Sequence, residues 1–145
     1  MLTTDEKFLI GTVLGDGNLH RRFKWENVTS IKLAHAPKEY DWLQWKVDKA
    51  SKILNSSASI TKALNKGDLK AYQWCAGFSK FVHLYNLMYK EGKKIFCQNV
   101  LSELGLQELA IFWCDDGCIV KNLRIKTDPR TGKTLKRPLL LQTGF

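Results

Sequence analysis

The stretch FLIGTVLGDG at residues 8–17 decides the fold, because a related stretch, LAIFWCDDG at residues 109–117, returns a hundred residues later. Each is an apolar run closed by Asp-Gly, and the spacing of its apolar residues suits a buried helix. Glycine commonly follows the last residue of a helix, so Asp16 and Asp116 are predicted to lie at helix C-termini. The helix dipole disfavours a carboxylate there by about 0.3–1 kcal/mol, and two such carboxylates favour a bound cation.

Small residues recur within both stretches. Gly11 and Gly15 lie four residues apart and leave a strip where a second backbone approaches closely. Ala110 and Cys114 have the same spacing, and the bulkier Ile111 facing a glycine would make the helix pair asymmetric. A single Asp-Gly is ordinary turn chemistry. Repetition of the whole block instead indicates two paired helices.

The two nine-residue blocks that end in Gly17 and Gly117 resemble the paired motifs of LAGLIDADG homing endonucleases. The resemblance implies that the motif helices pack side by side and that the acid before each final glycine binds divalent metal and is catalytic. These acids are Asp16 and Asp116, and the implied metal is Mg2+. Asp115 is a weaker candidate, because the adjacent residue on a helix points about 100° away.

A lysine after the third predicted helix is also suggested by the resemblance to lie near the active site. Lys94 matches best, with Lys93 as the near alternative. A catalytic lysine beside a phosphodiester stabilises developing charge or helps to organise the attacking water. The other interpretation is a solvated basic pair after a helix C-terminus.

Charge and composition restrict the class of partner. The chain of 145 residues has a net charge of +9 and a pI near 9.5, which favours polyanions through phosphate neutralisation, with a solvated basic surface as the alternative. No stretch resembles a signal peptide or a membrane span, so an intracellular protein without a membrane segment is expected. Four cysteines without zinc-type pairing are interpreted as reduced, mostly buried thiols: Cys75, Cys97, Cys114 and Cys118.

The chain between the two blocks alternates between predicted strands and helices. The predicted elements are strands at 18–25 and 30–35, a helix opened by Pro37 and ending near Asn55, strands at 57–64 and 69–78, and a helix over 81–88. This order predicts an α+β fold, a four-stranded antiparallel sheet with helices on one face. The resemblance makes it a LAGLIDADG homing endonuclease-like saddle over DNA, with a first half at 1–104 and a second at 105–145.

The open face of this sheet is predicted to be polar and basic. Alternation places His20, Arg22 and Lys24 on one side of the first strand, and Ser30 and Lys32 on the outward side of the second. A two-stranded ribbon fits the major groove, so the basic residues among these are the first candidates for contacts with double-stranded DNA. Four aromatic residues are interpreted as core, with stacking on bases as the alternative: Trp42, Trp45, Tyr72 and Trp74.

Beyond Gly117 the pattern begins to repeat. Residues 122–126 alternate, residues 128–132 give a strong turn signal, and 139–143 resume as a strand. Basic residues here, including Arg124 and Lys126, are predicted to follow a phosphate backbone. The second half is expected to be incomplete, and to be completed by a separately encoded C-terminal half or by self-association.

The sequence therefore predicts a homing endonuclease, or the N-terminal part of one, that makes Mg2+-dependent hydrolytic double-strand cuts at a long specific site. The alternative is a non-catalytic DNA- or RNA-binding remnant, or an RNA-splicing maturase of the same fold. Acids retained at both helix ends favour the enzyme. The missing part of the second half favours the alternative.

Overall fold

Helices and strands follow one another in an order close to the predicted one. The computed structural model describes residues 1–21, 28–118, 126–127, 134–135 and 142–143. In chain order the elements are α1 (Thr4–Leu14), β1 (Asn18–Arg21), β2 (Thr29–His35), the short 3-10 helix η1 (Pro37–Glu39), α2 (Tyr40–Leu54), β3 (Thr61–Asn65), β4 (Asp68–Phe78), α3 (His83–Met88), β5 (Tyr89–Lys90), β6 (Lys93–Lys94), α4 (Gln98–Leu101), α5 (Leu106–Asp116), β7 (Gly117–Cys118), β8 (Lys126–Thr127), β9 (Thr134–Leu135) and β10 (Gln142–Thr143).

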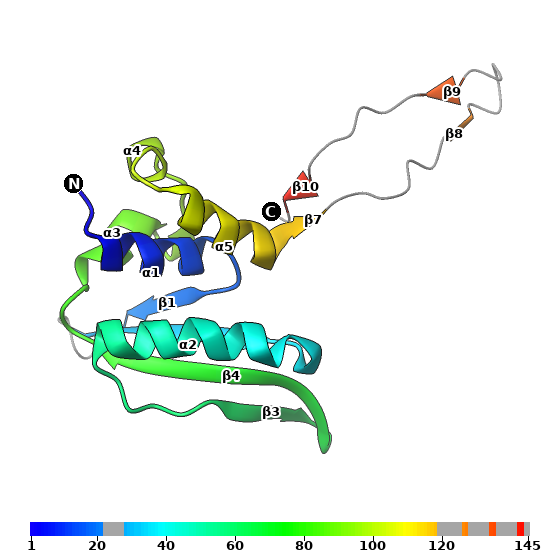
Figure 1. The fold of residues 1–145 in the computed structure, drawn as a ribbon, viewed down its shortest axis with the longest axis horizontal. Helices are drawn as coiled ribbons and strands as arrows, with labels where there is room; N and C mark the ends of the chain where they lie inside the picture. Colours follow the sequence, from blue (N-terminus) through cyan, green and yellow to red (C-terminus); the bar gives the residue numbers. More distant parts are fainter. Residues whose placement is uncertain (22–27, 119–125, 128–133, 136–141, 144–145) are drawn as a thin grey trace.

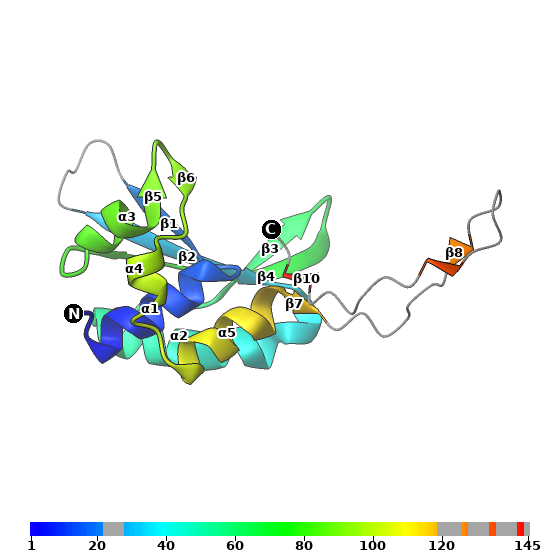
Figure 2. The same ribbon diagram turned by 90° about the horizontal axis from the view of Figure 1, so that it is seen from above.

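A four-stranded antiparallel sheet in the order β1-β2-β4-β3 forms the centre of the fold. Helices α1, α2 and α5 lie on one side of this sheet, and α3 lies beside β1 (Figure 1, Figure 2). The opposite side carries none of these helices. The predicted α+β class, with helices covering one face of a four-stranded sheet, is confirmed.

Helix α1 lies in the core because, after its charged first turn, it carries no charged residue on any side. Residues 8–14 are buried without exception. At its start, the Thr3 hydroxyl accepts a hydrogen bond from the backbone N–H of Glu6, and the Glu6 side chain accepts one from the backbone N–H of Thr3. The helix ends at Leu14 with Gly15 as its C-cap, two residues before the predicted end at Asp16.

The Glu6 carboxylate gives α1 a pH-dependent contribution to stability. The hydrogen bond from the Thr3 backbone is the main cause that lowers the pKa of Glu6 below its usual 4.5. A carboxylate with a lowered pKa stabilises the fold above that usual value, and the contribution is lost as the pH falls through the folded pKa. We expect Glu6→Gln to lower the free energy of unfolding by about 0.3–1 kcal/mol at neutral pH. Urea unfolding at pH 7 and at about pH 3 measures this, and a difference that does not shrink on acidification would contradict it.

Strand register sets the composition of the uncovered side of the sheet. Asn18 pairs with Lys32, and Lys32 pairs with Cys75 on β4, so these three residues form one row. His20 and Ser30 form the next pair. The exposed His20 and Lys32 lie outward as predicted. By its register Ser30 lies on the same side, but it is buried, and its hydroxyl donates to the His20 carbonyl.

Helix α2 packs its apolar stripe against β2 and β4. The stripe contains Leu43, Val47 and Ala50, all buried as predicted. It also contains Lys46, a fully buried lysine. The helix ends where Asn55 adopts a left-handed conformation with φ of 50°, which asparagine tolerates better than most residues.

Two tight turns with positive φ close the β3–β4 and β5–β6 hairpins. Lys66 and Gly67 join β3 to β4 with φ of 51° and 90°, in the predicted turn. Glu91 and Gly92, with φ of 52° and 75°, join β5 to β6. Here the sequence predicts only a helix end, because strands of two residues are too short to give an alternation signal.

The described part of the second half consists of α5 and short strands. Strand β7 pairs with β10, and β8 pairs with β9, while the predicted turn at 128–132 lies outside the described residues. The predicted strand residues 122–125 and 139–141 lie outside the described residues. The predicted boundary between the halves, after residue 104, stays a prediction. In the part of the chain that the structure describes, no helix has the length and apolar character needed to cross a membrane.

The cysteines differ in part from their predicted burial. Cys75 lies on the uncovered side of β4 and is exposed, and Cys114 is exposed on α5, while Cys97 is partly buried. The prediction of mostly buried thiols is therefore wrong for Cys75 and Cys114. All three are free thiols, as expected.

Candidate active site

Helices α1 and α5 pack side by side, and two glycines of α1 permit their close approach (Figure 2). A Cβ atom added at Gly11 would lie 2.9 Å from the Cβ of Glu108, and one added at Gly15 would lie 2.5 Å from the Cβ of Asp115. The predicted glycine strip is confirmed. The atoms nearest to these glycines belong to Glu108 and Asp115 rather than to Ile111. Two carboxylate side chains thus make the helix pair asymmetric.

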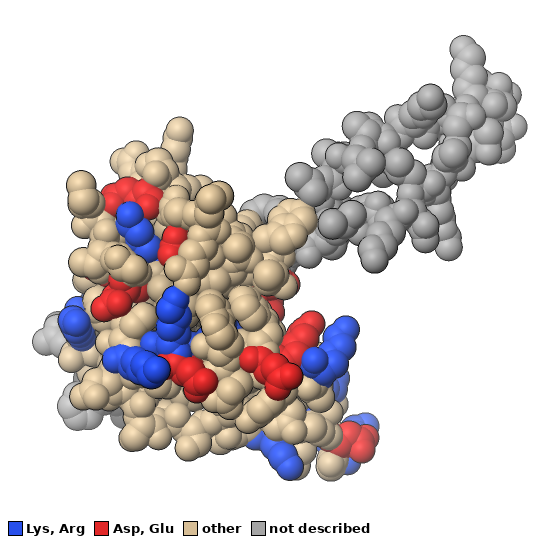
Figure 3. Space-filling view, viewed as in Figure 1, with Lys and Arg blue, Asp and Glu red and all other residues tan. Residues whose placement is uncertain are grey.

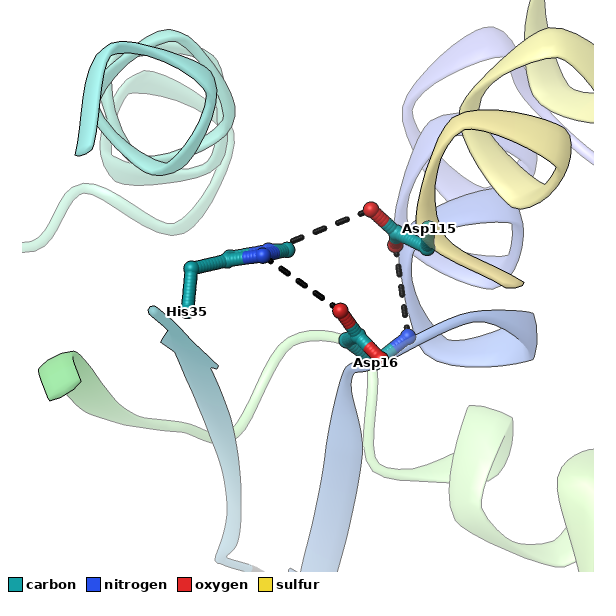
Figure 4. A group of neighbouring side chains, drawn as sticks. All are labelled: Asp16, His35 and Asp115. Atoms are coloured by element: carbon teal, nitrogen blue, oxygen red, sulfur yellow. Dashed lines mark hydrogen bonds and ion pairs between the residues drawn. The ribbon is translucent and has the colours of Figure 1, made fainter. Parts of the chain in front are cut away.

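Three side chains from separate elements meet where α1 ends (Figure 4). Asp16 follows α1, His35 ends β2, and Asp115 lies in the last turn of α5. One potential ligand atom from each lies within 4.8 Å of the others. Asp16 Oδ2 is 3.3 Å from His35 Nδ1, and Asp115 Oδ2 accepts a 3.3 Å hydrogen bond from the backbone N–H of Asp16.

His35 is the member of this group that the sequence patterns do not single out. Its side chain is 1% exposed, with Nδ1 3.5 Å from Oε2 of Glu39 and Nε2 3.9 Å from Oδ1 of Asp115. Within the described part of the chain, neither ring nitrogen makes a hydrogen bond. The alternation that turns Ile31 and Leu33 inward also turns His35 inward, and this is the signal that could have identified it.

Asp115 is surrounded by donors. Lys46 Nζ lies 2.8 Å from its Oδ1 and 2.9 Å from its Oδ2, and Trp42 Nε1 donates to Oδ1 at 2.7 Å. With the Asp16 backbone N–H, both oxygens accept two hydrogen bonds each. The side chains of Lys46 and Asp115 are both 0% exposed. Asp115 is therefore one half of a buried ion pair.

Lys94 lies at the end of α1, close to Asp16 in space. From β6, its Nζ donates to the carbonyl oxygens of Val13 at 2.5 Å, Gly15 at 3.1 Å and Gly17 at 3.0 Å. The Val13 and Gly15 carbonyls belong to the negative end of the dipole of α1, which a cation stabilises, and the Gly17 carbonyl follows the helix. Lys93 is exposed, so of the two predicted lysines Lys94 is the one that reaches this site.

The other predicted site residues are distributed as follows. The Asp16 side chain is 37% exposed and reaches solvent. Asp116 is the last residue of α5, and its side chain lies outside the described residues, as do those of Arg22, Lys24, Arg124 and Lys126. Their predicted roles stay predictions.

Seen from the helical side, basic and acidic side chains are interspersed rather than gathered into patches of one sign (Figure 3).

Paired helices that bring a carboxylate to their common end, beside a sheet with one uncovered face, are the arrangement that the resemblance to LAGLIDADG homing endonucleases implies. The profile of the LAGLIDADG DNA endonuclease family matches residues 6–139, and the chain belongs to this family.

Curated relatives cover most of this chain. The chain is 29% identical over 135 residues to a protein named RecA from Mycolicibacterium chitae, covering 90% of this chain and 31% of that protein. It is 29% identical over 118 residues to RecA from Mycobacterium shimoidei, covering 80% of this chain and 27% of that one. The chain thus spans between about a quarter and a third of the length of these relatives.

Among solved structures, the homing endonuclease I-WcaI bound to its DNA recognition sequence superposes with a TM-score of 0.62 at 20% identity, covering 84% of this chain and 54% of that one. I-DmoI in complex with DNA and Mn gives a TM-score of 0.43 at 14% identity, covering 79% of this chain and 62% of that one. The likeness to I-WcaI shows that the fold is homing endonuclease-like, as predicted.

Proposed function

We propose that this chain is a homing endonuclease, or the N-terminal part of one, that makes Mg2+-dependent hydrolytic double-strand cuts at a long specific DNA site. The observation that supports this most directly is the Asp16 carboxylate. It is partly exposed at the end of a motif helix and lies against the last turn of the second motif helix. Discrimination from a non-catalytic binding module requires a cleavage measurement, which the Asp16 variant described in the Discussion provides.

The residues around Asp16 fit a divalent cation. Mg2+ takes oxygen ligands and keeps several waters, so one or two carboxylates that reach solvent suffice to hold it. We assign Asp16 as one ligand and Asp116 as the second. The buried His35 ring lies next to this carboxylate, with Nδ1 3.3 Å from Asp16 Oδ2. Neither ring nitrogen makes a hydrogen bond in the described residues, so the ring can interact with a ligand bound beside Asp16. Asp115 does not fit, since both its oxygens are already saturated by donors.

Once bound, Mg2+ supplies Lewis acidity that activates water and stabilises the leaving oxygen. The chain's own residues orient this chemistry. The Asp16 carboxylate follows the end of α1, and Lys94 fixes the main chain there by donating to three carbonyl oxygens. The three donors of the Lys94 ammonium are taken by these carbonyls, so in the proposed complex Lys94 acts on the charge that develops on the phosphodiester through its positive charge rather than through a hydrogen bond.

Contacts with the DNA backbone are proposed for the uncovered side of the sheet. Replacing Arg22, Lys24 and Lys32 together by Gln is expected to weaken DNA affinity and to flatten its dependence on salt, by about 0.9 log unit of slope for each phosphate that is no longer neutralised. Fluorescence anisotropy over a salt series measures both quantities. Replacing three lysines on the helical side, Lys38, Lys49 and Lys52, changes the net charge equally and is the matched control. Equal slopes for the two triple variants would mean that the sheet residues are simply solvated.

Completion by a second half is proposed for α5. The helix exposes Leu106 and Leu109, which are 88% and 46% accessible, and an apolar surface of this kind promotes association. A separately encoded C-terminal half, or a second copy of the chain, would cover it. We expect the isolated chain to lack specific nuclease activity and to gain it with the partner. Light scattering and a cleavage assay, with and without the product of any downstream reading frame, test this; a monomer that cuts specific duplex DNA unaided would refute it.

A further inference from the structure

We propose that Asp115, Lys46 and Trp42 form a positioning network that fixes the main chain at Asp16. The inference rests on the proposed function, because it assigns how the carboxylate proposed to bind metal is held. It gives Asp115 a role different from that of a metal ligand, although Asp115 lies within reach of Asp16 and His35.

The donors around Asp115 exclude it from the metal site. A carboxylate with two oxygens offers about four lone-pair sites, and all four are engaged by Lys46, Trp42 and the Asp16 backbone. A divalent cation on either oxygen would lie next to an ammonium group 2.8 Å from Oδ1. The metal ion and the Lys46 ammonium would repel each other strongly at so short a distance, because the side chains of Lys46 and Asp115 are both shielded from solvent.

The hydrogen bond from the Asp16 N–H connects this ion pair to the main chain that carries the proposed metal ligand. Asp115 Oδ2 accepts from both the Asp16 backbone and Lys46. Lys46 comes from α2, which packs on the sheet, and Asp115 comes from α5. The position of the Asp16 backbone is thereby set by Asp115 of α5, which Lys46 in turn holds against α2.

Gly15 provides the space for this arrangement. In the two repeated blocks Gly15 and Asp115 occupy equivalent positions, each directly before the Asp-Gly pair. The carboxylate of Asp115 lies where a side chain at position 15 would be, with its Cγ 2.8 Å from an added Cβ. The two blocks therefore differ at this position in a complementary way: the second block supplies the Asp115 carboxylate, and the first leaves space for it at Gly15.

Stability alone does not account for a buried ion pair. Apolar residues of similar volume are often as stable or more stable in its place, whereas removal of one partner leaves an uncompensated buried charge. Lys46 lies in the apolar stripe of α2, between Leu43 and Ala50, where an apolar residue would pack without this cost. The polar pair is better explained by the hydrogen bond that it delivers to Asp16.

The test separates positioning from packing with four variants. Lys46→Met and Asp115→Leu remove one partner each, the double variant removes both, and Trp42→Phe removes one donor while keeping an aromatic ring. Lys52→Met, exposed on the same helix, is the control. Thermal unfolding, the NMR resonance of the Asp16 amide, Mn2+ binding and DNA cleavage by the complemented enzyme are measured for each.

We expect the single Lys46 and Asp115 variants to lose about 10 °C or more in melting temperature, and the double variant to recover most of it. Despite this recovery, the double variant is expected to keep a shifted, more rapidly exchanging Asp16 amide and to cleave about 100-fold more slowly, because small misplacements at a reacting centre have effects of that size. Trp42→Phe is expected to fold normally and to cleave about tenfold more slowly, since it removes one of the donors that orient Asp115.

Two results would overturn the proposal. A double variant with a normal Asp16 amide and normal cleavage would make the network purely structural. Tighter Mn2+ binding by Lys46→Met would make Asp115 a metal ligand, since removal of a competing cation would then help the metal. If the wild-type complex binds no Mn2+ and cuts no DNA, the proposed function fails, and the amide resonance together with the melting temperatures still decides whether the network positions the loop.

Discussion

Asp16→Asn is expected to slow divalent-cation-dependent DNA cleavage by at least about 1,000-fold while leaving DNA affinity within about twofold. The substitution removes the charge of a proposed metal ligand but keeps its size and the helix end around it. Loss of a group that stabilises developing charge costs about 100- to 1,000-fold, and a weakened metal adds the loss of Lewis acid catalysis. Affinity should persist because the phosphate contacts proposed for the uncovered side of the sheet are elsewhere.

The measurement uses the complemented, active complex at saturating Mg2+. Asp48→Asn is the matched control, since Asp48 is an exposed carboxylate on α2 that accepts only a surface hydrogen bond from Gln44 in the described structure. Chelation of the metal should reproduce the Asp16 phenotype in the wild-type complex. Continued cutting by Asp16→Asn, at a rate near that of Asp48→Asn, would remove Asp16 from the metal site.

Gly15→Ala is expected to lower the free energy of unfolding by about 1–3 kcal/mol, the range found when a methyl group is forced into a packed core. The new Cβ would lie 2.5 Å from the Cβ and 2.8 Å from the Cγ of Asp115. Such distances require the neighbouring side chain to move. Asp115 cannot move freely, because Lys46 and Trp42 hold both of its oxygens. The strain therefore spreads to the helix pair.

Urea unfolding of Gly15→Ala and of Gly77→Ala provides the comparison. A Cβ at Gly77 would meet only a Val28 methyl carbon at 3.8 Å, and alanine in place of glycine reduces the entropy of the unfolded chain. The control should thus be neutral or slightly stabilising. Equal stability of the two variants would show that α1 and α5 separate at little cost.

Much of the fold follows from periodicity in the sequence. The repeated block identifies the helix pair, the glycine spacing identifies its contact strip, and the end of the apolar stripe of α2 predicts the helix end near Asn55, which is the C-cap. These features are local, since each depends on which face of one element is apolar. The short strands β5 and β6 escape such reasoning, because two residues carry no period.

The candidate site is only partly predictable, because the periodicity of a sequence tells on which face of a helix or strand a residue lies but not which residue it contacts there. The separation of about 100° between neighbouring helical residues distinguishes Asp115 from Asp116, but it does not tell which of the two faces α2. Lys46 stands in an apolar stripe and His35 on the inward face of a strand, and both anomalies are visible in the sequence. Their meaning appears only when residues separated by 69 positions, such as Lys46 and Asp115, are brought together.

The long sequence separation of these interactions bears on how the protein is made. Asp16 depends on Lys94, whose hydrogen bonds span up to 81 positions, and on Asp115, 99 positions away. Pairings so distant in sequence form late, because loop closure must precede them. A nascent chain that emerges from the ribosome therefore carries the Asp16 carboxylate long before its surroundings exist. The site is assembled only when synthesis has passed the second motif helix, so any shorter translation product contains the acid without its geometry.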